Sequence, residues 1–291
     1  MNTSSSVIQP LSLDVFQQKK IQVSIKRDDL IHPFISGNKW RKLKYVLRDA
    51  KEKQKTTLAT FGGAFSNHLL AVASAGATFG FKTVGFVRGD ELDIKNPVLK
   101  MCHLFGMRLI FVARDEYRNK DVLFAKYFDT NKSVYFVPEG GSCMKALPGV
   151  AEILDELTDT YDYLFTASGT GGTLAGLAKG VADKHLATKV NGIAVIKGGE
   201  YLNHEIEKWI GNTPYTLHTN FHRGGYAKTD NELVLFARNF SRKTGIVIEP
   251  IYTAKMIMAV MELASQDYFE PDSKVLCIHT GGIWGGIGLL F

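Results

Sequence analysis

Short runs of apolar and β-branched residues alternate with segments of helical period along most of the chain. Repeated units of this kind place their strands parallel, with the helices packed on the sheet faces. An α/β fold with mostly parallel sheets is therefore expected. The predicted strands are 22–26, 57–61, 83–87, 108–112, 134–137, 163–166, 192–196 and 275–278, and the predicted helices are 66–79, 147–157, 173–182, 231–244 and 254–264.

The chain is long enough to form more than one hydrophobic core. At 291 residues and 45% hydrophobic content, it predicts about two lobes. The segment 52–140 holds its own succession of predicted strands and helices, so we expect a small domain of residues 52–140 inserted into a large domain of residues 1–51 and 141–291.

Charge and cysteine content exclude several functional classes. The 35 basic residues exceed the 29 acidic ones only modestly and are dispersed, so nucleic acid is not an expected partner. Three widely spaced cysteines form no CxxC pair, which predicts neither a disulfide framework nor a metal site. No stretch has the length of a membrane helix and the start lacks a signal-peptide pattern, so we expect no membrane association and a cytoplasmic location.

A glycine-rich segment follows the predicted strand 163–166 and opens a predicted helix. Its sequence is Ser168-Gly169-Thr170-Gly171-Gly172-Thr173. Amides at such a turn, together with the helix N-terminus, favour a phosphate. The segment lacks the lysine of a P-loop and the spacing of a dinucleotide fingerprint, so a nucleotide is disfavoured. The structural alternative is a turn whose glycines serve only close packing.

Two further clusters follow predicted strands. The first, Gly62-Gly63-Ala64-Phe65-Ser66-Asn67-His68, offers free amides that suit a carboxylate, although Ser66 alone is best explained as a helix N-cap. The second is His279-Thr280-Gly281-Gly282, whose threonine suits either a ring nitrogen or a simple turn. Open α/β sheets bind ligands at the carboxyl ends of their strands, where all three clusters are expected to lie.

A phosphate site without a nucleotide fingerprint raises the possibility of pyridoxal 5'-phosphate (PLP), which needs a lysine amine. Lys39 follows the helix-start signature Ser36-Gly37-Asn38, where the helix dipole and partial burial would favour its neutral, nucleophilic form. Lys42 and Lys44 are expected to be exposed neighbours. Without the glycine clusters, Lys39 would be read as an ordinary surface residue.

These motifs together resemble the 1-aminocyclopropane-1-carboxylate deaminase and D-cysteine desulfhydrase family. The resemblance spans nearly the whole chain and implies PLP bound to Lys39 as a Schiff base. It also implies a tryptophan-synthase-beta-like PLP fold, with two open, mostly parallel sheets flanked by helices, and a homodimer. The motifs that carry it are Lys26-Arg27-Asp28-Asp29-Leu30, Ser36 to Leu43, Gly62 to His68, the cradle at Ser168, Tyr226 after Gly224-Gly225, Tyr252 after Glu249-Pro250-Ile251, and His279 to Gly282.

The resemblance assigns a role to each matching position. Asn67 would contact the cofactor ring oxygen, the loop from Ser168 to Thr173 would hold the phosphate, and Thr253 or Thr280 would meet the ring nitrogen. Ser66, Asn67 and His68 would bind the substrate carboxylate. The catalytic residues would be Lys39, Ser66, Tyr226 and Tyr252, although core packing is the alternative for both tyrosines.

One departure from the deaminases bears on the substrate. Thr253 follows Tyr252 where the deaminases carry a glutamate, and a hydroxyl makes the cofactor a weaker electron sink. The resemblance therefore favours β-elimination, with D-cysteine giving pyruvate, hydrogen sulfide and ammonia. The first alternative is 1-aminocyclopropane-1-carboxylate deamination to 2-oxobutanoate and ammonia. Alternatives of other classes are a non-catalytic PLP or phosphate-ligand binding protein, and a sugar-phosphate or nucleotide enzyme.

Overall fold

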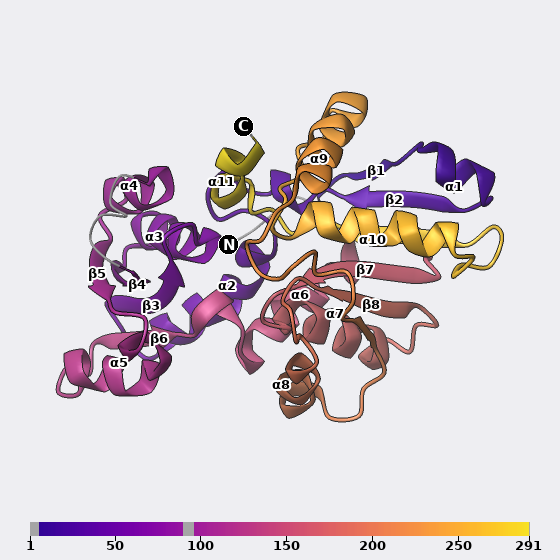
Figure 1. The fold of residues 1–291 in the computed structure, drawn as a ribbon. Coiled ribbons are helices and arrows are strands. Elements are labelled where there is room, and N and C mark those ends of the chain that lie inside the picture. The colour runs from indigo at the N-terminus through magenta and orange to yellow at the C-terminus, as the bar shows by residue number, and fades with distance from the viewer. Residues whose placement is uncertain (1–5, 90–95, 291) are drawn as a thin grey trace.

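Two lobes, each built on its own sheet, make up the chain (Figure 1). The computed structural model describes residues 6–89 and 96–290. The six-stranded sheet has the order β1-β2-β10-β7-β8-β9, and the four-stranded sheet has the order β5-β4-β3-β6. Among the described residues only β1 pairs antiparallel, which confirms the prediction of two mostly parallel sheets.

The strands follow the predicted pattern with small shifts. Two three-residue strands at the edges of the six-stranded sheet, β1 and β9, are additional, because three residues are too few for a periodic pattern. The predicted strand 192–196 begins and ends earlier, as β8. The bounds are β1 (Ile8–Pro10), β2 (Gln22–Lys26), β3 (Thr57–Gly63), β4 (Lys82–Arg88), β5 (Arg108–Val112), β6 (Val134–Val137), β7 (Tyr163–Ser168), β8 (Lys189–Ala194), β9 (Thr216–His218) and β10 (Lys274–Ile278).

Helices cover both faces of the large sheet, with α10 on one side and α7 on the other (Figure 1). The predicted helix 147–157 is wrong in its second half, where i→i−3 hydrogen bonds replace the α-helical pattern. The bounds are α1 (Asp14–Gln18), α2 (Asn38–Glu52), α3 (Asn67–Phe79), α4 (Pro97–Leu104), α5 (Lys120–Phe128), α6 (Leu147–Ala151), α7 (Gly172–Asp183), α8 (Tyr201–Ile210), α9 (Asn231–Thr244), α10 (Thr253–Ser265) and α11 (Ile283–Gly286).

Helix α2 connects the two lobes. Its apolar side chains, among them Trp40, Leu43 and Leu47, share a core with the four-stranded sheet, although residues 1–51 were expected in the large domain. On another side Arg41 pairs with Asp28 and Glu156 of the large lobe. All four strands of the small sheet lie between residues 57 and 137, inside the 52–140 segment; the domain boundaries themselves stay a prediction.

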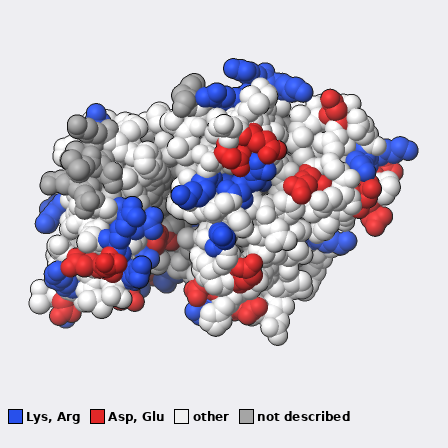
Figure 2. Space-filling view, viewed as in Figure 1, with Lys and Arg blue, Asp and Glu red and all other residues white. Residues whose placement is uncertain are grey.

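The surface carries both signs of charge. Figure 2 shows basic and acidic side chains interspersed over one face and a hollow where the lobes meet. Among the helices of residues 6–89 and 96–290, none is both long and apolar enough to cross a membrane. The hollow leads to the carboxyl ends of β3 and β7, the place where parallel sheets bind ligands.

Candidate active site

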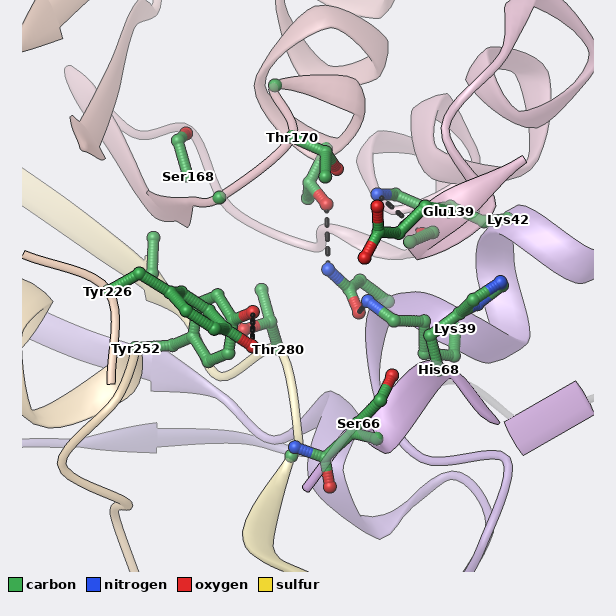
Figure 3. Close-up of a pocket in the computed structure, with 18 of the residues that line it drawn as sticks. Lys39, Lys42, Ser66, His68, Glu139, Ser168, Thr170, Tyr226, Tyr252 and Thr280 are labelled. Atoms are coloured by element: carbon green, nitrogen blue, oxygen red, sulfur yellow. Dashed lines mark hydrogen bonds between the residues drawn. The ribbon is translucent and has the colours of Figure 1, made fainter. Parts of the chain in front are cut away.

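A cavity of about 360 Å³ lies between the lobes. This volume suits a small cofactor or substrate. Its wall includes the ends of β3, β4 and β7 and the first turns of α2, α3 and α7, and Figure 3 shows the side chains converging on it. All three glycine clusters therefore meet here. The predicted site residues that line it are Lys39, Ser66, Asn67, His68, Ser168, Gly169, Thr170, Gly171, Thr173, Tyr226, Tyr252 and Thr280.

Lys39 enters the cavity from the first turn of α2. Its Nζ donates to Asn38 Oδ1 at 3.0 Å, while Asn38 Nδ2 donates to Thr173 Oγ1 at 2.8 Å. Burial lowers the pKa of Lys39 to about 8, so a useful fraction of its amine is neutral near physiological pH. Gly37 has a φ of +61° and approaches Thr280 so closely that a Cβ would lie 2.0 Å from its carbonyl oxygen.

Lys42 is buried, which corrects the expectation that it is exposed. Its side chain is 2% exposed, and its Nζ donates to Ser142 Oγ at 2.9 Å and to the Gly140 carbonyl at 3.3 Å. Burial, followed by the charge of Lys39, holds its pKa well below the usual range. No carboxylate of the described residues lies within 4.0 Å of its Nζ, so this amine has only neutral oxygen partners. Lys44 instead pairs with Glu152 and is partly exposed.

The glycine-rich loop lies beside Lys42. Gly171, with a φ of +76°, is the N-cap of α7, so the first amides of this helix have no intrahelical acceptor. A Cβ at Gly169 would lie 2.9 Å from the Tyr252 ring, so only glycine keeps this space open. Thr170 Oγ1 lies 2.6 Å from Ser142 Oγ, the group that Lys42 contacts. Gly172 does not line the cavity but lies against Ser142 and Lys42.

Ser66 and Asn67 present donors at the start of α3. Ser66 Oγ accepts from the Leu69 amide at 3.3 Å, which confirms the capping role and leaves the hydroxyl hydrogen free to donate. Asn67 Oδ1 accepts from the Gly285 amide at 2.8 Å, so its Nδ2 is the group available to an acceptor in the cavity. An oxyanion would be bound well here.

The ring of His68 is fixed in one tautomer. The Thr60 hydroxyl donates to the Val137 carbonyl at 2.8 Å, so His68 Nε2 must donate to Thr60 Oγ1, also 2.8 Å away. Nδ1 is then an acceptor, and it is buried without a partner. Burial and the charges of Lys39 and Lys42 hold the pKa of His68 well below its usual range. A substrate carboxylate would therefore meet its backbone amide rather than its ring.

Tyr226 and Tyr252 face each other in the cavity (Figure 3). Their hydroxyl oxygens are 3.3 Å apart and their ring centroids 5.9 Å apart. Thr280 lines the cavity, whereas Thr253 does not. The Thr253 hydroxyl is buried against Glu249, donating to its Oε1 at 3.0 Å and accepting from its amide at 3.0 Å. Of the two threonines, Thr280 is the one available to a ring nitrogen.

PLP fits these groups. A phosphate dianion at the α7 N-terminus would favour the charged form of Lys42, and Lys39 would supply the amine. Asn67 Nδ2 is left for the ring oxygen and Thr280 for the ring nitrogen. Sequence reasoning missed several lining residues, among them Lys42, Arg88, Glu139 and Tyr201. Lys42 was identifiable by its i+3 spacing from Lys39, and Arg88 and Glu139 by their places at or just after strand ends, whereas Tyr201 had no signal.

Comparisons with known proteins agree with this geometry. A model of the family described as pyridoxal-phosphate dependent enzyme matches residues 8–281. A Thermotoga maritima protein named "Putative 1-aminocyclopropane-1-carboxylate deaminase" is 34% identical, over 90% of this chain and 89% of its own. The D-cysteine desulfhydrase of Yersinia enterocolitica is 27% identical, over 90% and 86%. A crystal structure described as an ACC deaminase homologue superposes with a TM-score of 0.84 at 28% identity, over 97% and 90%.

Proposed function

Because the chain belongs to the family of pyridoxal-phosphate dependent enzymes, in its 1-aminocyclopropane-1-carboxylate deaminase and D-cysteine desulfhydrase group, we propose that it eliminates the β-substituent of a small amino acid. D-Cysteine and water would give pyruvate, hydrogen sulfide and ammonia. The observation that carries the proposal is the pair of buried lysines on α2, one placed for the imine and one for the phosphate, with the uncharged Thr280 available to the ring nitrogen.

Each residue has a definable task in this reaction. The bound cofactor supplies an electron-withdrawing ring that accepts charge as the α-proton leaves. Ser66 and the first amides of α3 bind and orient the substrate carboxylate. The Lys39 amine takes the α-proton, for which a pKa of about 8 is well matched. The Tyr226 and Tyr252 hydroxyls face the same space and protonate the departing sulfur.

The second candidate is deamination of 1-aminocyclopropane-1-carboxylate. The name of the Thermotoga maritima relative and the description of the solved homologue favour it. It needs the same Lys39, but opening a carbon ring asks more of the cofactor as an electron sink. The Thr280 hydroxyl would stabilise a protonated ring nitrogen less well than a carboxylate would. Cofactor binding without turnover is the remaining alternative. A homodimer and a cytoplasmic location stay predictions.

A spectrum with product assays tests the proposal. The purified protein is expected to absorb in the visible region and to change spectrum with D-cysteine or β-chloro-D-alanine, releasing pyruvate. L-Cysteine and 1-aminocyclopropane-1-carboxylate are tested beside them, with 2-oxobutanoate assayed. Pyruvate from D-cysteine alone supports the proposal, whereas 2-oxobutanoate supports the second candidate. Lys39→Ala should abolish the visible band, and Lys44→Ala is the matched control. A band that survives Lys39→Ala refutes the imine assignment.

A further inference from the structure

Lys255 is a buried lysine outside the cavity wall. It is the third residue of α10 and is 1% exposed. A cation is disfavoured both by burial and by the positive end of a helix dipole. Burial lowers its pKa to about 8, against the attraction of Glu249 and Asp230. No carboxylate of the described part of the chain lies within 4.0 Å of its Nζ, so an ion pair does not explain its place.

Its hydrogen-bond partner is the backbone of the segment that carries Tyr226. Lys255 Nζ donates to the Gly225 carbonyl at 2.7 Å, directly before Tyr226. The same carbonyl accepts from the Lys228 amide at 3.2 Å, and the Gly225 amide donates to the His222 carbonyl at 3.0 Å. Gly225 has a φ of +117°, a conformation that L-residues rarely adopt. Among the hydrogen bonds of the described residues, the one from Lys255 is the one that reaches the backbone of this turn from a distant part of the chain.

Tyr226 is only partly buried and lies outside regular secondary structure. Its side chain is 42% exposed, and it contacts Tyr252 from a turn rather than from a helix or strand. Tyr252, by contrast, is the N-cap of α10, and its amide is bound by the Glu249 carboxylate at 3.0 Å. Lys255 lies one helical turn after Tyr252. The start of α10 thus holds Tyr252 directly and, through Lys255, the turn that bears Tyr226.

We propose that Lys255 is a positioning residue that sets the Tyr226 hydroxyl against Tyr252 by holding the Gly225 carbonyl. It touches neither substrate nor cofactor. The inference rests on the proposed function, because Lys255 would act through the two tyrosines that this function assigns to the leaving group. Removing the ammonium releases the turn, so Tyr226 samples positions from which it no longer reaches the leaving group. Cofactor binding is unaffected, because Lys39, Lys42 and the glycine-rich loop lie on other elements.

The first test is hydrogen exchange in the holoenzyme, which needs no substrate. Lys255→Met keeps the length and removes the donor. Amides in the peptide 222–228 are expected to exchange about tenfold faster or more, while those of α7 stay unchanged. The surface variant Lys208→Met, which loses an exposed pair with Glu205, is the control. Unchanged exchange in 222–228 overturns the proposal, whatever the enzyme's substrate proves to be.

The second test is a double-mutant cycle on kcat for the amino acid that is turned over. Lys255→Met is expected to lower kcat about tenfold in the native background and less than about twofold in a Tyr226→Phe background, because the loss acts through that hydroxyl. A general weakening of α10 would cost the same in both, and that result overturns the proposal. If no tested amino acid is turned over, the proposed function fails while the exchange result still decides the role of Lys255.

Discussion

Lys39 and Lys42 lie three residues apart on α2 and send their amines into one cavity. Burial, and then the charge of Lys39, hold the pKa of Lys42 well below its usual range. Two buried cations side by side are costly unless an anion compensates them. The nearest groups to Lys42 are the neutral oxygens of Ser142 and Gly140, so a phosphate at the glycine-rich loop would offset that cost.

Removing the Lys42 ammonium should weaken PLP binding without removing the imine. A charged hydrogen bond contributes about 1.5–3 kcal/mol, so Lys42→Met should raise the dissociation constant of PLP at least about tenfold. Titration of the apoprotein, followed by its visible absorbance, measures this. Lys44→Met, which loses only a partly exposed pair with Glu152, should change nothing. Equal affinities for Lys42→Met and the native chain would place the phosphate elsewhere.

Reconstitution with PLP should depend on pH through Lys39. Only the neutral amine attacks the aldehyde, and burial lowers the pKa of Lys39 to about 8. The rate constant should therefore rise about tenfold per unit below pH 8 and level off above it. Stopped-flow mixing of apoprotein and PLP between pH 6.5 and 10 shows the midpoint. A rate constant that still rises about tenfold per unit up to pH 10 would mean that the Lys39 amine keeps the ordinary pKa of 10.5, like a surface lysine.

The sheets were predictable because their strands are long and regular. Seven of the eight predicted strands coincide with observed ones to within a few residues, and the eighth is β8, shifted toward the N-terminus. Strands β1 and β9 were not predicted, because each has only three residues and forms by pairing with a neighbouring strand, β2 or β8, rather than from a periodic pattern of its own. The small helix α8 was missed, although its tyrosine, Tyr201, lines the cavity.

The site residues that belong to sequence motifs could be predicted, whereas the contacts that their side chains make in the folded chain could not. The burial of Lys42 depends on Ser142, which lies 100 residues away in sequence. From its place after Tyr252, the Thr253 hydroxyl was expected to be available to the cofactor ring nitrogen. Instead, the Glu249 carboxylate lies over the start of α10 and accepts hydrogen bonds from the Thr253 hydroxyl and amide. The contact of Lys42 with Ser142 has no local sequence signature, although the i+3 spacing from Lys39 places Lys42 on the same face of α2. The contact of Thr253 with Glu249 spans only four residues, but the residue types alone do not show that the carboxylate turns back onto the hydroxyl.

Thr253→Val should cost stability. The Thr253 hydroxyl accepts from the buried Glu249 amide, and valine leaves that N–H without its acceptor. A buried donor left unsatisfied costs about 1–3 kcal/mol, to be measured by urea unfolding. Thr78→Val is the control, because its hydroxyl only donates to the Ser74 carbonyl one helical turn earlier and should cost no more than about 0.5 kcal/mol. Equal losses for the two variants would contradict the assigned contact.

Arg41 should hold α2 to the large lobe through a buried ion cluster. Its guanidinium binds Asp28 at 2.9 Å and also contacts Glu156, so Arg41→Met should destabilise the fold by about 3–5 kcal/mol.

Burial raises the pKa of Glu156, but hydrogen bonds from Arg41 and Lys26 outweigh it and bring that pKa to about 2. The folded-state pKa is thus below the ordinary 4.5, so this stabilisation is present above pH 4.5 and is lost as pH falls toward 2. Urea unfolding between pH 3 and 7 should show a shallower pH dependence for Arg41→Met than for the control Lys274→Met, which loses an exposed pair with Asp159. Parallel pH curves would mean that Arg41 does not set the ionisation of Glu156.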